Sequence, residues 1–236
     1  QLLGLIRSDP SISDDRVATL EWAFMPTLQG KKDSISLQHH LAEQPSFFVD
    51  VVSLVFRSTQ TNDNGKSKIS EVHAMNAWRL LHSWTTVPGT DYESGAINED
   101  RLLTWTTEAR TLLSQCGRSD VGDSCIGQVL ANAPGDEDGT WPCKPVRDLI
   151  EDLDSENLNT GFVTGIQNKR GVSTRALDEG GDQEYELERK YNKLAESLNL
   201  EWPIVARLLR SVANSYHAEG VHNDEEAQRF REGFDR

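Results

Sequence analysis

The segment Phe47-Phe48-Val49-Asp50-Val51-Val52-Ser53-Leu54-Val55-Phe56 is the most hydrophobic stretch of the chain, and its interpretation decides the fold. Its β-branched residues are compatible with a strand. Helical spacing fits the segment better, because Phe47, Val51 and Val55 recur at every fourth position along one face. We therefore predict a centrally buried helix here, with a strand as the alternative.

Helical spacing continues on both sides of this segment. Ser13, Asn98 and Asp182 are suited to cap helix N-termini, and Pro203 suits a first turn. The predicted helices begin at residue 13 with a break at Pro26, and then cover residues 34–43, 69–85, 98–117, 125–130, 145–153, 155–166, 182–198 and 203–216. The last of them either extends beyond residue 219 or frays there.

These patterns predict an all-α fold, an irregular stack of about ten antiparallel helices that is bundle-like or solenoid-like. No repeat of fixed period is present in the sequence, so a regular repeat array is not supported. We expect residues 1–236 to form a single helical domain, with a sub-boundary near residues 134–145 as the alternative.

The start of the chain is apolar from Gln1 to Ile6, and Arg7 and Pro10 end that run. Six residues are too few for a membrane span or the hydrophobic part of a signal peptide. This start predicts a C-terminal fragment of a larger protein; a processed natural N-terminus is the alternative.

The formal net charge of −14 argues against non-specific binding to nucleic acid or to anionic membranes, because both would repel the chain. We expect no direct nucleic-acid partner and no membrane. Cys116, Cys125 and Cys143 contain no CxxC pair, which is typical of reduced thiols in a cytoplasmic protein.

His39, His40 and Glu43 are the nearest approach to a metal-ligand set in the sequence. On a helix His39 and Glu43 lie one turn apart and could reach the same cation, but a third ligand is unassigned and HExxH is absent. Exposed histidines on a polar helix are the alternative, and we predict no cofactor. Asp136 begins an acidic loop, but the position that closes a calcium loop is Arg147, a cation.

The basic segment at residues 168–175 stands out in an acidic chain. Lys169, Arg170 and Arg175 lie close to Ser173 and Thr174, and together they are candidates to bind a phosphate or an acidic segment of a partner. The alternative is structural: the cations complement the end of a helix, and Arg175 pairs with a neighbouring carboxylate.

Signatures of common enzymes are absent: the sequence has no Gly-rich phosphate loop, no GxSxG elbow and no GxGxxG after a strand. In five short sequence stretches the chain resembles the C-terminal helical region of large uncharacterised bacterial proteins, namely at residues 20–24, 79–84, 138–142, 168–172 and 179–184. That resemblance implies a larger N-terminal portion and no particular activity or cofactor.

The expected function is therefore a non-enzymatic helical module, for protein interaction or regulation, within a larger bacterial protein. Its partner is expected to be another protein or the upstream domains of the same chain. A metal-assisted hydrolase using His39, His40 and Glu43, and a phosphate- or nucleotide-sensing domain using Arg170 and Arg175, are the alternatives.

Overall fold

The computed structural model describes residues 6, 9, 11–27, 35–56, 71–171, 174–176 and 178–234. Within these ranges it contains ten α-helices, one short 3₁₀ helix and no strand, which confirms the all-α prediction. The α-helices are α2 (Asp14–Phe24), α3 (Ile35–Glu43), α4 (Pro45–Val55), α5 (Glu71–Ser83), α6 (Glu99–Gln115), α7 (Ser119–Leu130), α8 (Lys144–Leu153), α9 (Glu156–Lys169), α10 (Asp182–Leu198) and α11 (Pro203–Phe234).

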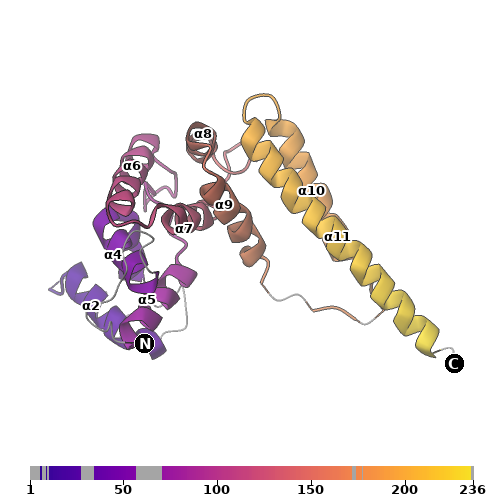
Figure 1. The fold of residues 1–236 in the computed structure, drawn as a ribbon, viewed down its shortest axis with the longest axis horizontal. Coiled ribbons are helices and arrows are strands. Elements are labelled where there is room, and N and C mark those ends of the chain that lie inside the picture. The colour runs from indigo at the N-terminus through magenta and orange to yellow at the C-terminus, as the bar shows by residue number, and fades with distance from the viewer. Residues whose placement is uncertain are drawn as a thin grey trace.

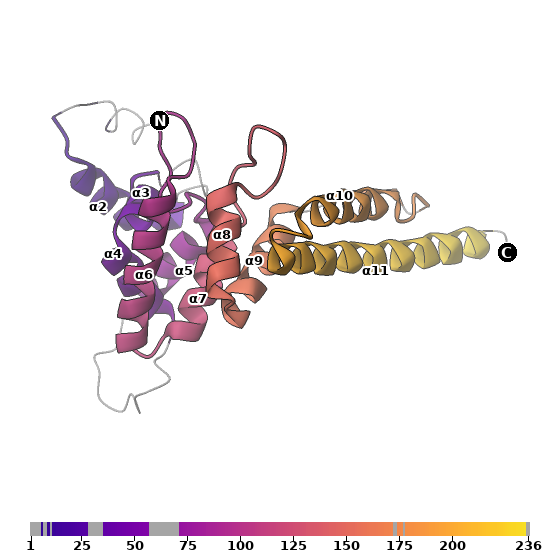
Figure 2. The ribbon, with the colours of Figure 1, turned by 90° about the horizontal axis from the view of Figure 1, so that it is seen from above.

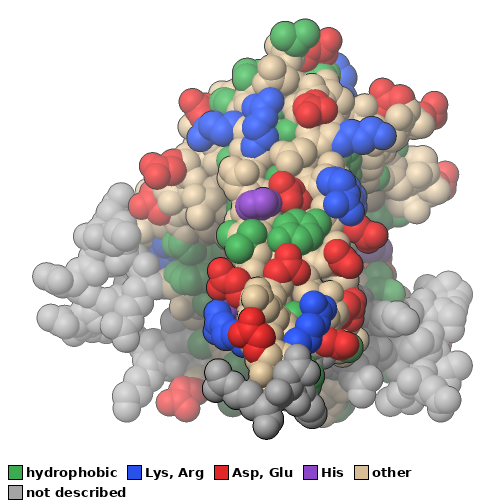
Figure 3. All heavy atoms as spheres, turned by 90° about the vertical axis from the view of Figure 1, so that its right-hand side faces the viewer, with side chains coloured by type: hydrophobic (Ala, Val, Ile, Leu, Met, Phe, Trp, Pro, Cys, Tyr) green, Lys and Arg blue, Asp and Glu red, His purple; other side chains and the backbone are tan. Residues whose placement is uncertain are grey.

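The helices are arranged as a body and a projecting hairpin (Figures 1 and 2). Helices α2 to α9 stack irregularly in the body. Helices α10 and α11 run antiparallel and project from it, and α11 continues well past the start of α10. The view toward this projecting side shows acidic and basic side chains interspersed, as on an ordinary solvated face (Figure 3).

Helix α4 forms the centre of the body, so the helical interpretation of residues 47–56 is confirmed. Phe48, Val51 and Val52 are fully or almost fully buried. The Phe48 ring lies 5.3 Å from the ring of Trp84 and 5.2 Å from that of Trp105, measured between centroids. Three large aromatic side chains from different elements therefore fill the space around α4.

Helices α7 and α9 pack backbone against backbone through glycines. A Cβ atom on Gly127 of α7 would lie 2.0 Å from the carbonyl oxygen of Leu158, and one on Gly161 of α9 would lie 2.1 Å from that of Ser124. Neither distance is sterically possible, so both positions require glycine for this approach. The close contact fixes α9, and the chain that follows it, against α7.

Two predicted helix starts differ in detail from the structure. Asn98 does cap α6, because its Oδ1 accepts a hydrogen bond of 2.9 Å from the backbone N–H of Arg101. Ser13 occupies the N-cap position of α2 without a side-chain hydrogen bond. Asp182 is the first residue of α10 rather than its cap, since Gly181 precedes it at the N-cap position.

Only part of the apolar surface of α5 is buried. Helical spacing in the predicted helix at residues 69–85 places Ala77 and Trp78 on one face, but Ala77 and Leu80 are the buried apolar residues of α5 and Trp78 is 50% exposed. Two helical faces of α5 carry apolar residues, and the periodicity could not distinguish the face that packs on α4 from the face that remains open.

The acidic loop before α8 is anchored to the body. Arg147 is buried, and its Nη1 lies 2.8 Å from Oδ2 of Asp136, while its guanidinium lies 4.1 Å from the ring centroid of Trp202. Trp141 stacks on Phe162, with 5.6 Å between the centroids. Arg147, which stands where a calcium loop would need its closing glutamate, thus forms an ion pair with Asp136 of the same loop.

All three cysteines are free thiols. None of the helices in the described ranges has the length and apolar character needed to cross a bilayer.

Candidate functional site

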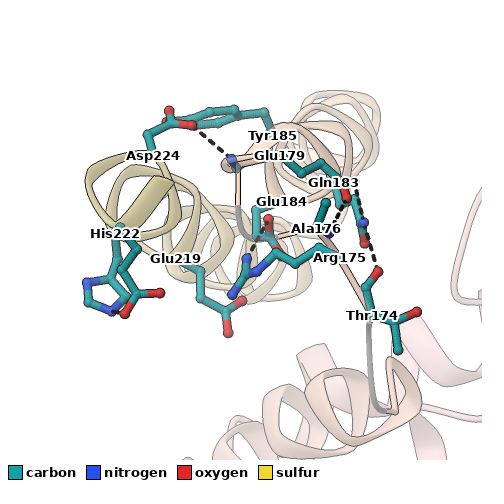
Figure 4. Close-up of polar contacts among 12 residues, drawn as sticks. Thr174, Arg175, Ala176, Glu179, Gln183, Glu184, Tyr185, Glu219, His222 and Asp224 are labelled. Atoms are coloured by element: carbon teal, nitrogen blue, oxygen red, sulfur yellow. Dashed lines mark hydrogen bonds and ion pairs between the residues drawn. The ribbon is translucent and has the colours of Figure 1, made fainter. Parts of the chain in front are cut away.

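The basic segment predicted as a binding site lies at the junction between the body and the hairpin (Figure 4). Lys169 is the last residue of α9, Arg170 follows it, and Thr174 and Arg175 belong to the connection that leads to α10. Ser173 lies outside the described residues. Arg170 and Arg175 both contact Glu184 in the first turn of α10.

Glu184 is the centre of the ion-pair network at this junction. Its side chain, in the first turn of α10, is 3% exposed and pairs with the guanidinium of Arg170. Arg170 also binds Glu219 of α11, with 2.8 Å between Nη1 and Oε2, and Arg175 lies 3.6 Å from Glu184. We call these four residues the Glu184 cluster; it joins the end of α9 to both helices of the hairpin.

The ionised form of Glu184 is stabilised by this arrangement. Burial by itself raises the pKa of the Glu184 carboxyl, but the hydrogen bond from Arg170, the neighbouring amide of Asn223 and the charge of Arg170 together outweigh it, so the pKa lies below its ordinary value. Glu184 is consequently ionised at neutral pH and paired with the positive charge of Arg170.

Acid should therefore weaken the folded protein through Glu184. A depressed carboxyl pKa contributes stability that is present above the unfolded pKa, about 4.3, and is lost as the pH falls through the folded pKa. We expect the free energy of unfolding of the wild type to exceed that of Glu184→Gln at pH 7, and the gap to narrow toward pH 3. Urea unfolding of both proteins between pH 3 and pH 7 measures this difference in the free energy of unfolding. A difference that does not change with pH would contradict the lowered pKa of Glu184.

The connection beyond Arg175 is tied down by further hydrogen bonds (Figure 4). Gln183 donates to the carbonyl of Thr174 at 3.4 Å and to Glu179 at 2.7 Å. Asp224 of α11 accepts from the backbone N–H of Gly181 and from the hydroxyl of Tyr185, both at 2.8 Å. These hydrogen bonds hold the connection against the hairpin.

The three candidate metal ligands do not converge on one point, because His39 and Glu43 both contact Tyr92 whereas His40 contacts Asp15. The His39 ring stacks on Tyr92, with 4.1 Å between the centroids, and burial is the main cause that lowers the pKa of His39. His40 lies 3.3 Å from Asp15 of α2, whereas Glu43 is the hydrogen-bond partner of Tyr92. Within the part of the chain that the structure describes, no group of three or more His, Cys, Asp or Glu side chains could hold a metal ion.

A groove of about 450 Å³ lies between α5, α7 and α9, and we call it the α5 groove. Val55, Phe56, Trp78 and Leu81 form an apolar wall. Polar amide side chains face the same space; they belong to Gln128, Asn132 and Asn168. Apolar walls combined with a few amides are typical of sites that bind a partner by shape and by main-chain hydrogen bonds.

Cys125 and His82 also line the α5 groove, but they do not form an activated pair. Burial raises the pKa of the Cys125 thiol to about 12, so it is protonated and weakly nucleophilic at neutral pH. The ring of His82 stacks on Trp78, with 5.0 Å between the centroids. The chemistry of the groove therefore favours binding over nucleophilic catalysis.

An apolar stripe on the open face of α5 adjoins the groove. Val72, Met75 and Trp78 are 59%, 49% and 50% exposed and share one face of the helix, at intervals of three residues. Helical spacing did not identify this surface, because it does not show which face of a helix its neighbours cover. A usable signal was present, since α5 carries more large apolar residues than one inward face needs.

The chain matches no protein-family model, no curated protein and no solved structure.

Proposed function

We propose that the protein is a non-enzymatic interaction module that binds an extended peptide segment of a partner in the α5 groove. The single observation that supports this most strongly is the open apolar face of α5 beside a groove of about 450 Å³. A row of three half-exposed large side chains on one helix face is costly in water, and such rows commonly mark protein contacts.

The groove suits an extended segment that carries large apolar side chains. Trp78, Met75 and Phe56 supply apolar contact area, and tryptophan is the residue type most often found at energetic centres of interfaces. Asn132 and Asn168 offer hydrogen bonds to a peptide main chain. An extended main chain needs such partners, because its N–H and C=O groups are not bonded internally as they are in a helix.

Substitution of Trp78 should remove most of this binding. Peptides selected from a random display library against the intact protein should carry large apolar residues and bind Trp78→Ala roughly thirtyfold more weakly, which corresponds to a loss of about 2 kcal/mol. Fluorescence anisotropy with labelled peptides measures the change.

Leu103→Ala is the matched control, because Leu103 is also 50% exposed but lies on α6, away from the groove. Its binding should equal that of the wild type. Peptides that bind the Trp78 and Leu103 variants equally well would rule out the groove as the docking surface. Turnover of any substrate in a broad hydrolase screen would overturn the non-enzymatic part of the proposal.

A further inference from the structure

A second cavity, of about 570 Å³, lies between the body and the hairpin. Its walls come from the loop at residues 135–141, from α9 and the residue after it, and from α10 and α11. Three cations and three aromatic side chains line it: Lys169, Arg170, Lys190, Trp141, Tyr191 and Tyr216. We call it the cationic cleft.

Each cation of the cleft lies near the ring of one of its aromatic residues. The cation lies between 5.3 and 5.5 Å from the ring centroid in the pairs Arg170–Tyr216, Lys169–Trp141 and Lys190–Tyr191. The rings of Tyr191 and Tyr216 stack on each other, with 5.8 Å between centroids and 12° between planes. The cleft thus combines positive charge with flat aromatic surface.

The charge balance of the cleft is opposite to that of the chain, whose formal net charge is −14. Glu184 and Glu219 partly neutralise Arg170, whereas Lys190 is an exposed residue of α10. Lys190 forms no ion pair with any described residue. Lys169 sits at the opposite wall and donates to the carbonyl of Ala131 at 2.9 Å.

The tyrosine hydroxyls of the cleft remain donors at neutral pH. Burial raises the pKa of Tyr191 to about 12, and burial also raises the pKa of Tyr216. Neither hydroxyl therefore adds negative charge beside the lysines. Protonated hydroxyls can donate hydrogen bonds to the oxygen atoms of an anion.

We propose that the cationic cleft binds a nucleotide. Its volume lies within the range of about 300–1,000 Å³ common for small-molecule sites. Lys190 and Lys169 pair with phosphate oxygens, as ammonium groups commonly do. Phe162 covers one face of Trp141 and Tyr216 covers one face of Tyr191, so a base stacks on the other face, in the place that the lysine leaves when it pairs with the phosphate. Lys169 lines both this cleft and the α5 groove, but Lys190, Tyr191 and Tyr216 line only the cleft, so a test at Lys190 is independent of the α5 groove.

The test compares two lysines of the same helix. Lys190 and Lys193 are both exposed residues of α10, but only Lys190 lines the cleft. Isothermal titration of the intact protein with AMP, GMP, CMP and UMP should detect binding of at least one of them. Lys190→Ala should weaken that binding about tenfold, because a hydrogen bond to a charged group is lost, whereas Lys193→Ala should not change it.

Adenosine and inorganic phosphate separate the contributions of the base and the phosphate. Each should bind more weakly than AMP if both parts of the nucleotide contact the cleft. The proposal is overturned if none of the four nucleotides binds at millimolar concentration, or if the Lys190 and Lys193 variants lose affinity equally. Phosphate that binds as tightly as AMP would also overturn it, because the rings would then contribute nothing.

Discussion

Arg170→Met is expected to lower the free energy of unfolding by about 3 kcal/mol. The change removes the main partner of Glu184, whose side chain is 3% exposed, and leaves a buried carboxylate without its compensating charge. The same change frees Glu219, which is exposed and contributes little. Urea unfolding at pH 7, followed by circular dichroism, measures the loss.

Arg175→Met is the matched control for this prediction. Arg175 reaches the same carboxylate from a longer distance, 3.6 Å, and is 36% exposed, so its removal should cost less than about 1 kcal/mol. The double variant Arg170→Met/Glu184→Gln should be more stable than Arg170→Met alone, because it no longer buries an unpaired charge. Equal losses for the two arginine variants would show that Arg170 is not the main partner of Glu184.

Gly161→Ala is expected to destabilise the protein by about 2–3 kcal/mol, although alanine is the better helix former. The added methyl group would lie 2.1 Å from the carbonyl oxygen of Ser124, so α7 and α9 would have to separate. Because backbone atoms cannot rotate away as a side chain can, the whole contact shifts. Thermal and urea unfolding should both show the decrease.

Gly233→Ala is the control, for which we expect no loss of stability. Gly233 lies in the last turn of α11, and a Cβ atom there would have no atom within 4 Å. Alanine should therefore leave the stability unchanged or raise it by up to about 1 kcal/mol, as helix propensity predicts. A Gly161 variant that is as stable as the wild type would show that the α7–α9 contact is looser than described.

The helices themselves could be predicted from local sequence, and α6 shows why. Asn98 supplies the cap, Leu102, Trp105 and Ala109 supply the buried face, and Gly117 supplies a left-handed residue after the end, with φ of 67°. Each signal acts within a few residues along the chain. Helix α7 was predicted too short, as 125–130 rather than Ser119–Leu130, because Gly122 and Gly127 weaken its local helical signal.

The candidate site could be predicted only in part. The unusual basic composition of residues 168–175 was visible, but the partners of Arg170 are Glu184 and Glu219, which lie 14 and 49 residues further along the chain. Sequence cannot show that one of these carboxylates is buried. Lys190, which lines the cationic cleft, could not be recognised from the sequence either, because α10 carries many charged residues.

Local sequence by itself determined the all-helical class, most helix positions and the break between α9 and α10, because hydrophobic spacing, caps and glycines act over short distances. Only the tertiary structure decided which face of α5 stays open, why Gly127 and Gly161 must lack side chains, and which charges meet at the hairpin. These features depend on contacts between residues far apart in the chain, and a helix with two apolar faces does not reveal which one its neighbour will cover.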